Sequence, residues 1–293
     1  MFKKVSLYQI ADDRVVDILN QIKTKGEGLL SEFKFKSPLK EEKSSIGFSF
    51  TKFNSEELVT QLDGDIILRV TTQSKSPNKA QIEDSYKKKL DKASEELPVG
   101  SVINKEMQKQ LKEEAIQQVL ADTFPSAPKH QYVVIRKTGM IMVDGKGNSA
   151  ENALSLIRKA LGSLPAAPLT ALTGDTIDML KTWVVEDIAD SITLGEKATL
   201  IDDSENEYKA KGHLGGDEKV VSILESPAAL VTNVEVSRDF IKKVTINEDL
   251  HFSGISFDKE FTQDEESLQG TLLLQMKEVM MLIDDVLGRL VEG

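Results

Sequence analysis

The chain has 293 residues, a formal net charge of −11 at pH 7 and no cysteine. A length of this order corresponds to two or three units of roughly 100–200 residues each. The lack of cysteine excludes disulfides, thiolate metal sites and a cysteine nucleophile, and it suits a reducing cytoplasm. We expect no membrane segment, because the long apolar stretch 268–291 contains five charged side chains that a spanning helix would have to bury.

Charge is segregated along the chain. Residues 1–170 hold 26 basic against 22 acidic side chains, whereas residues 171–293 hold 11 against 26. An acidic protein repels nucleic acid as a whole, but a basic inner wall can concentrate positive potential locally whatever the net charge. Two ordinary solvated surfaces would explain the same counts equally well.

The first 75 residues predict one layer of an α+β domain. Residues 5–10 predict a strand, and Asp12 or Asp13 can cap the helix that follows. Segments 46–53 and 65–71 predict two further strands, the first from alternating apolar residues and the second from a nearly continuous apolar run.

Two helices, over residues 78–97 and 103–121, are predicted as an insertion into this domain. Their apolar stripes are thin and their polar faces are rich in lysine, so the pair must pack against something else. Strands over 132–137 and 140–144 then predict a hairpin around Gly139, and the α+β pattern resumes.

Residues 171–262 predict a separate, acidic, β-rich unit. Short apolar runs bounded by Gly, Asp and Asn predict its strands, at 198–201, 220–224, 231–236, 241–246 and 252–257. The helix expected from residue 268 onward has an apolar face wide enough to require two neighbours. The inserted helical pair and another subunit are the two candidates.

Little in the chain indicates catalysis. Its three histidines have no partner at metal-binding helical spacing, which argues against a zinc hydrolase. Residues 144–149 lie between a strand and a helix but lack the order of a phosphate-binding loop, so we expect a tight turn. The carboxylates available to a two-metal nuclease are Asp63 with Asp65, Asp144 and the acidic segment 202–207, all in turn-like contexts. We expect no cofactor and no catalytic or metal-binding residue.

Lysines on the inserted helices are the stronger candidates for a binding surface. They are Lys75, just before the first helix, then Lys79, Lys87, Lys88, Lys89 and Lys92, and on the second helix Lys105, Lys109 and Lys112. The acidic residues between them make i,i+4 ion pairs on a solvated helix an equally good explanation. Because no aromatic residues alternate with these lysines, any contact with DNA would be to phosphates rather than bases. Lys146, before the next predicted helix, could touch a phosphate in the same way.

The segment 139–169 carries the most specific signal. It predicts a strand, a glycine turn and an amphipathic helix that Asn148 and Glu151 cap and that Gly162 and Pro165 end. Residues 158–165, Arg-Lys-Ala-Leu-Gly-Ser-Leu-Pro, closely resemble the central segment of RdgC, a family of bacterial recombination-associated proteins that bind duplex DNA. The resemblance continues at Phe2-Lys3-Lys4 with Tyr8, at Leu120-Ala121-Asp122-Thr123-Phe124 and at Trp183.

The resemblance implies an α+β fold that assembles into a ring-shaped homodimer around DNA. The implied units are a central α+β domain (1–75 and 122–170), a helical base (76–121 and 263–293) and a β-rich tip (171–262). The implied function is sequence-independent binding of double-stranded DNA that inhibits recombinase-mediated homologous recombination. A protein of this kind would be non-enzymatic, cytoplasmic and associated with the nucleoid, without contact with a membrane.

The resemblance also adds contacts with DNA. It implies that Phe124 matters for DNA engagement, together with Lys209 and Lys211 on a tip hairpin. The hairpin departs from the family's pattern at Gly212 and His213, where a second lysine and an amide are usual. The segment 46–50 lacks the tryptophan and paired prolines of the family's N-terminal half. Two other functions remain open, a metal-dependent exonuclease and a module whose acidic tip mimics DNA.

Overall fold

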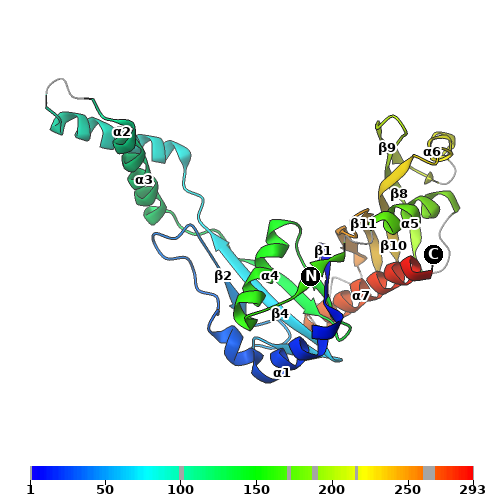
Figure 1. Ribbon diagram of the computed structural model, residues 1–293. Coiled ribbons are helices and arrows are strands. Elements are labelled where there is room, and N and C mark those ends of the chain that lie inside the picture. Colours follow the sequence, from blue (N-terminus) through cyan, green and yellow to red (C-terminus); the bar gives the residue numbers. More distant parts are fainter. Residues whose placement is uncertain are drawn as a thin grey trace.

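The computed structural model describes residues 2–98, 102–169, 173–186, 191–214, 217–259 and 268–292. Its scaffold is one antiparallel sheet with the strand order β2-β4-β5-β6-β1-β12-β11-β10-β8-β9. The short strands β3 and β7 pair with β4 and β1 at its margin. The fold is therefore a mixed α+β arrangement, as the sequence predicted (Figure 1).

The sheet has two halves that meet at β1 (Lys4–Ile10). The strands of the central half are β2 (Ser44–Ser49), β3 (Thr60–Leu62), β4 (Asp65–Ser74), β5 (Lys129–Ile135), β6 (Met140–Val143) and β7 (Ala166–Pro168). The strands of the second half are β8 (Thr193–Ile201), β9 (Glu207–Lys211), β10 (Leu230–Arg238), β11 (Ile241–Asn247) and β12 (Phe252–Phe257). β1 pairs with β6 through Ser6–Gln9 and with β12 through Lys4 and Val5. The β-rich segment thus continues the central sheet through the pairing of β1 with β12.

Seven α-helices accompany the sheet in the described part of the chain. They are α1 (Val15–Ser31, after the 3-10 turn η1, Asp12–Arg14), α2 (Lys79–Glu96), α3 (Lys105–Asp122), α4 (Asn148–Leu161), α5 (Thr173–Glu186), α6 (Glu218–Leu224) and α7 (Leu268–Glu292). The two inserted helices and the C-terminal helix lie where periodicity predicted them.

Two apolar cores occupy opposite faces of the sheet. On one face, α1 and α4 pack on the central strands around Ile66, Leu68 and Ile157. On the other face, α5, α6 and α7 pack on both halves of the sheet, around Trp183, Val234 and Ile283. Helix α7 therefore crosses the junction between the halves and holds them together. Burial of about 25 cal/mol per Å² of apolar surface makes these faces the main stabilising contribution.

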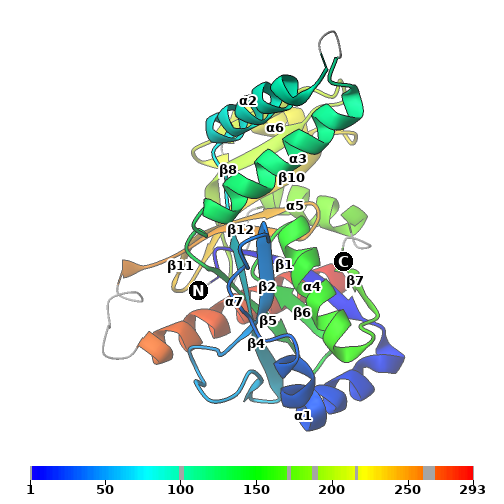
Figure 2. The same ribbon diagram turned by 90° about the vertical axis from the view of Figure 1, so that its left-hand side faces the viewer.

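Helices α2 and α3 form an arm that projects from the end of β4 (Figure 1). The side chains of Asn78 and Asn104 cap the two helices by accepting backbone N–H groups, and the helices contact each other along their length. No residue of α2 is buried. The arm and α7 lie well apart in both views (Figures 1 and 2). Within one chain the arm is therefore not the neighbour of the C-terminal helix. The sequence had suggested the inserted helical pair as one of two possible neighbours of that helix.

Two local predictions are corrected, and one helix was missed. Residues 220–224, predicted as a strand, belong to α6, because Asp217 caps a helix that buries Val220 and Leu224 on one face. Helix α5 was not predicted. Helix α4 starts after Gly147, whose φ of 54° suits glycine, so that Asn148 is the first helical residue and not the cap.

The end of α4 agrees with its prediction. Gly162 adopts a left-handed conformation with φ of 78° and terminates the helix ahead of Pro165.

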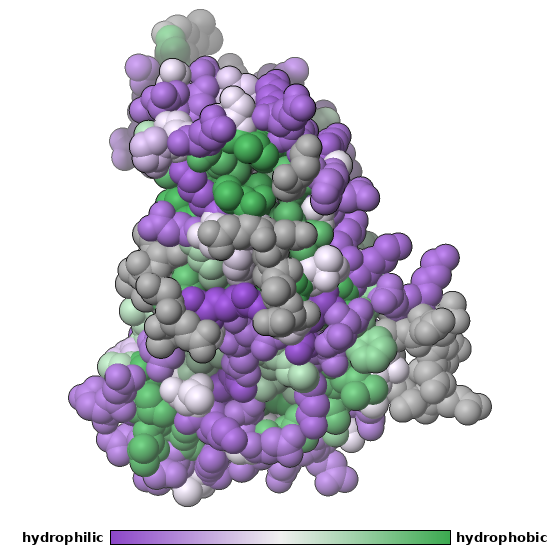
Figure 3. Space-filling model, turned by 90° about the vertical axis from the view of Figure 1, so that its right-hand side faces the viewer, coloured by the Kyte–Doolittle hydropathy of each residue, from purple (hydrophilic) through white to green (hydrophobic). Residues whose placement is uncertain are grey.

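The outer side of the molecule, which α5 and α6 help to form, is largely hydrophilic with apolar side chains between the polar ones (Figure 3). Val185 and Val221 are exposed apolar residues of these two helices.

Candidate nucleic-acid interface

The arm and the second half of the sheet rise from opposite ends of the central sheet and give the chain a V-shaped outline (Figure 1). Helix α4 and the start of β1 lie between them. We call the side of the molecule that the two limbs bound the concave side. The lysines predicted to contact DNA come from α2, from the turn before α4 and from β9, so all three segments border this side.

Lys75 is the exception, and its prediction is corrected. Its side chain is only 4% exposed. Its Nζ donates hydrogen bonds to three backbone carbonyl oxygens, those of Leu39 (2.9 Å), Lys40 (2.8 Å) and Leu120 (3.3 Å). A buried ammonium needs such partners. Lys75 therefore fastens the root of the arm to the neighbouring loop and is not available to a phosphate.

The other arm lysines divide into two groups. Lys88 pairs with Asp84 at 2.7 Å on the same helix, and Lys89 pairs with Glu114 of α3 at 3.3 Å. Lys79, Lys87 and Lys92 are exposed and form no ion pair within the described residues. Helix α2 contains five lysines and five acidic residues, so the helix as a whole carries no net positive charge.

Phe124 follows α3 and is 91% exposed. Its neighbour Pro125 forms an isolated bridge with Lys75, which places Phe124 at the root of the arm. The loop that contacts the Lys75 ammonium contributes a second exposed apolar residue, Leu39 (70%). Large apolar side chains exposed to this degree are unusual on a monomer surface when they cluster, and they favour a contact with another molecule.

The turn before α4 brings Lys146 to the junction of the two sheet halves. Ser6 of β1 donates a hydrogen bond to the carbonyl oxygen of Gly145 (2.6 Å), and its Oγ lies 3.1 Å from Nδ1 of His251, which follows β11. Burial lowers the pKa of His251, and the charge of Lys146 lowers it further. His251 is therefore neutral at pH 7, and the positive charge of this region belongs to exposed lysines.

Asp144, in the same turn, has its pKa raised to about 6, chiefly by burial. The backbone N–H of Lys3 donates a weak hydrogen bond to it at 3.4 Å and offsets part of this effect. A carboxyl group of this kind is mostly ionised at pH 7. It is the most perturbed of the carboxylates that the sequence offered for catalysis.

The remaining candidate carboxylates lie elsewhere and serve structural contacts. Asp65 accepts the backbone N–H of Lys137 and lies 3.7 Å from Arg136, while Asp202 accepts hydrogen bonds from Asn206 and Tyr208 in its own turn. Within the described residues no three His, Cys, Asp or Glu side chains converge as a metal site would require. The acidic groups proposed for a nuclease are thus not brought together.

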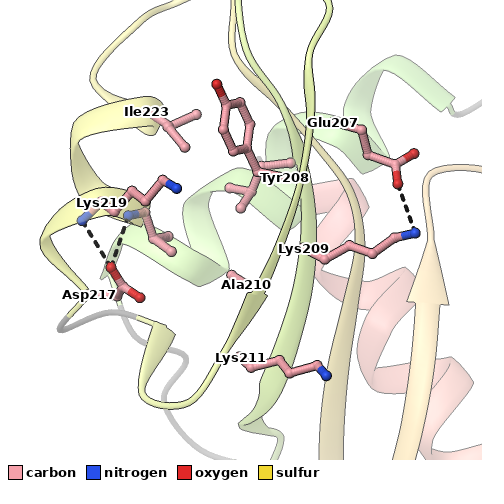
Figure 4. Close-up of a pocket in the computed structure, with 10 residues that line it drawn as sticks. Glu207, Tyr208, Lys209, Ala210, Lys211, Asp217, Lys219 and Ile223 are labelled. Atoms are coloured by element: carbon pink, nitrogen blue, oxygen red, sulfur yellow. Dashed lines mark hydrogen bonds and ion pairs between the residues drawn. The ribbon is translucent and has the colours of Figure 1, made fainter.

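Lys209 and Lys211 lie on β9 at the outer edge of the sheet. The side chains of Tyr208 and Ala210 alternate with them and face α6, where a pocket of about 300 Å³ also borders Lys219 and Ile223. Figure 4 shows Lys209 and Lys211 on the side of β9 away from α6, with Lys209 paired to Glu207 at 3.0 Å. Both ammonium groups therefore belong to the sheet face opposite α5 and α6.

Sequence inspection missed two lysines that share this face, Lys197 of β8 and Lys243 of β11. Lys197 pairs in register with Lys211, and Lys243 alternates with the buried residues Val244 and Ile246. Within each strand, the alternation of apolar and polar residues indicates which side chains share one face of the sheet. Alternation alone does not tell which strands are neighbours, so the cluster was not visible in the sequence.

Two residues that carry the resemblance to the family, Tyr8 and Trp183, stabilise the fold and do not belong to the candidate binding surface. Tyr8 donates a hydrogen bond from its hydroxyl to Oε1 of Glu151 (2.9 Å) and joins β1 to α4. Trp183 is 4% exposed and anchors α5 on the second half of the sheet.

Among the described residues, no helix combines the length and the hydropathy that crossing a membrane demands.

Comparisons with known proteins agree over the whole chain. Residues 1–293 match the model of a family described as "Putative exonuclease, RdgC". The chain is 24% identical over 272 residues to the recombination-associated protein RdgC of Pseudoalteromonas atlantica, covering 91% of this chain and 87% of the relative. It is 23% identical over 300 residues to the protein of that name from Haemophilus influenzae, covering 100% and 95%. The namesake from Xanthomonas axonopodis is 29% identical over 184 residues, 60% of each chain.

Proposed function

Because the chain belongs to the RdgC family, we propose that it binds duplex DNA without sequence preference and thereby restrains recombinase-driven strand exchange. The observation that carries the proposal is the distribution of exposed lysines. Segments more than a hundred residues apart, α2 and β9, both place exposed lysines along the concave side of a chain whose net charge is −11. The relatives' name, recombination-associated protein, supports the link to recombination.

The character of these side chains favours contact with phosphates. Lysine is a flexible point charge, and contacts to phosphates position a protein on DNA without reading its sequence. The lysine-rich sequence of α2 shows no recognition-helix pattern. Binding should therefore depend steeply on salt and little on sequence.

A ring-shaped homodimer is the assembly that best accounts for the exposed apolar residues. Phe124 and Leu39 at the root of the arm, and Leu274 and Met281 of α7 (51% and 47% exposed), offer apolar side chains to a second copy at two separate places on the chain. Contacts at both places would close two chains around DNA. A duplex held in this way would obstruct a recombinase filament on the same DNA, and the protein would be found at the nucleoid.

Exonuclease activity is the second candidate, because the description of the family includes it. It would require carboxylates that hold metal ions beside the scissile phosphate. The described residues provide separate acidic groups rather than such a cluster. We therefore propose binding without cleavage, and treat cleavage as a result that the same experiment can detect.

The test is a native gel of an end-labelled linear duplex with Mg²⁺ present, across a salt series. We expect an intact, retarded band that fades as salt rises, with a log–log slope of roughly −0.9 per neutralised phosphate. Shortened fragments would support the exonuclease. An intact duplex that stays unshifted at low salt would overturn DNA binding and favour an acidic module that captures a DNA-binding partner.

A further inference from the structure

The second half of the sheet has one face that no described helix covers. Helices α5, α6 and α7 pack on the opposite face, against Ala198 and Leu200 of β8, Val234 of β10 and Val244 of β11. The side chains that alternate with these buried residues form what we call the open sheet face. It begins at Lys4 in β1 and ends at Lys211 in β9.

Strand register shows that the lysines of these strands share the open sheet face. Lys197 lies opposite Lys211, and Thr199 lies opposite Lys209, on β8 and β9. Lys4 lies opposite Ser253, and Lys243 opposite Ser256, so the row continues through β12 to β1. Directly opposed residues of an antiparallel pair point to the same face, about 5 Å apart. The lysines therefore form a single array.

Positive charge dominates this array although the surrounding sequence is strongly acidic. The charged residues that strand register assigns to the open sheet face are Lys4, Lys197, Lys209, Lys211, Lys243, Glu207 and Glu235, and all five lysines are exposed. Glu235 pairs with Lys197 at 3.3 Å and Glu207 pairs with Lys209. No ion pair involves Lys4, Lys211 or Lys243 within the described residues.

Acidic residues of this half are concentrated away from the open sheet face. Asp217 and Glu218 lie at the start of α6, and Glu278, Asp284 and Asp285 lie on α7. The fold thus sorts the charges of an acidic segment onto two surfaces. One surface, formed by helices and turns, is acidic, and the other, formed by strands, is basic.

The open sheet face looks toward the arm. Strands β8 and β9 stand between the arm and α6 (Figure 1), and the arm lies nearest the viewer when the molecule is turned (Figure 2). Figure 4 places the side chains of Lys209 and Lys211 on the side of β9 away from α6. The array therefore lines the concave side, opposite α2.

We propose that the open sheet face binds the sugar–phosphate backbone of duplex DNA, with Lys197 and Lys243 as contacts in addition to Lys209 and Lys211. This inference rests on the proposed function and names the surface that performs it. Ser, Thr and Asn side chains between the lysines, such as Thr199, Asn233 and Ser256, supply hydrogen-bond donors for phosphate oxygens.

The chemistry of this face favours duplex over single-stranded DNA. Proteins that hold single strands stack the bases on aromatic side chains. The described strand residues that point to the open sheet face include no aromatic ring, and Tyr208 points to the other side of β9 (Figure 4). A flat array of lysines and small polar groups contacts backbones without reading bases.

The test compares two double variants with equal net charge. Lys197→Gln/Lys243→Gln removes two lysines from the open sheet face, and Lys23→Gln/Lys219→Gln removes one exposed lysine each from α1 and α6, away from that face. Affinity for a duplex is measured across a salt series, and thermal unfolding verifies that both variants are folded. Glutamine keeps the apolar stem of lysine and avoids repulsion with Glu235.

We expect the first variant to bind about tenfold or more weakly near 0.1 M salt, equally for duplexes of different sequence, with a log–log slope reduced by roughly 0.9 for each lost contact. The control variant should bind like the unmodified protein. If the unmodified protein binds duplex but the two variants match it, or lose affinity equally, the inference is wrong while the proposed function stands. If the unmodified protein does not bind, both are wrong.

Discussion

Arg238, at the end of β10, donates a hydrogen bond from Nε to Oδ2 of Asp285 on α7 at 2.8 Å. Its Nη1 donates to Glu278, two helical turns before Asp285, at 3.1 Å. The side chain of Arg238 is only 6% exposed. On the other flank of the same helix, Arg136 pairs with Asp284. The charges of α7 thus fasten one helix to both halves of the sheet.

The first prediction concerns Arg238. Arg238→Met should lower the free energy of unfolding by about 3–5 kcal/mol, because it leaves two partly buried carboxylates without their partner. Urea denaturation measures this. Burial already raises the pKa of Glu278, and Arg238 opposes that shift, so the loss should shrink as the pH falls and Glu278 becomes protonated. Lys242→Met, an exposed neighbour, is the control and should change stability by no more than about 0.5 kcal/mol.

A second prediction follows from the buried ammonium of Lys75. Lys75→Met should cost about 2–4 kcal/mol of stability, since three carbonyl oxygens lose a charged donor. Hydrogen exchange should show the faster opening at the root of the arm, around Leu120. DNA affinity per folded molecule should change little. A variant that is fully stable yet loses DNA binding would return Lys75 to the list of direct contacts.

The third prediction separates assembly from folding at Phe124. Phe124→Ser should change the free energy of unfolding of the chain by less than about 0.5 kcal/mol, because the ring is exposed. Sedimentation velocity should show weaker self-association, and the affinity for long duplex should fall with it. Unchanged sedimentation would exclude this residue from a contact between copies.

Arm lysines provide the fourth prediction. Lys87→Gln/Lys92→Gln removes two exposed lysines without an ion-pair partner in the described structure, and should weaken binding of all duplexes severalfold, with a log–log slope reduced by up to roughly 0.9 per contact. Lys88→Gln/Lys89→Gln is the matched pair, whose ammonium groups are occupied by Asp84 and Glu114. Its effect on binding should be smaller. Equal affinities for both pairs and the unmodified protein would mean that the arm is only solvated.

The fifth prediction is a pH dependence at Asp144. Burial raises its pKa to about 6, against about 3.9 in an unfolded chain. Between these values the folded state binds a proton that the unfolded state lacks, so the associated stability is present below about pH 4 and is lost as the pH rises through 6. Asp144→Asn should therefore raise stability by up to about 3 kcal/mol at pH 8 and hardly at all at pH 4.

Thermal unfolding of both proteins across this pH range measures the difference. The same variant bears on cleavage. If the unmodified protein digests duplex in the presence of Mg²⁺ and Asp144→Asn does not, the carboxylate acts in catalysis and its raised pKa serves that purpose. A variant that binds DNA and is more stable than the unmodified protein at pH 8 supports the purely structural account.

Local patterns in the sequence determined a large part of the fold. The residue identities from Gly139 to Leu169 indicated the family, and helical periodicity located α2, α3, α4 and α7 to within a few residues. These features depend on side chains close in sequence, and their physical causes, caps and a repeating apolar face, act over a few residues. Where local patterns were ambiguous, as for Val220–Leu224, a short apolar run could not distinguish a strand from a helix.

Only the tertiary structure decided which lysines are available and which lie together. Lys75 belongs to a lysine-rich segment, yet the approach of Leu39 and Leu120 encloses it. Lys197 and Lys243 are unremarkable in sequence, yet long-range strand pairing sets them on one face beside Lys211. Register and the covering of sheet faces arise from contacts between distant segments, where a shift of one residue reverses every side chain. The acidic C-terminal segment therefore acquires a basic surface only on folding.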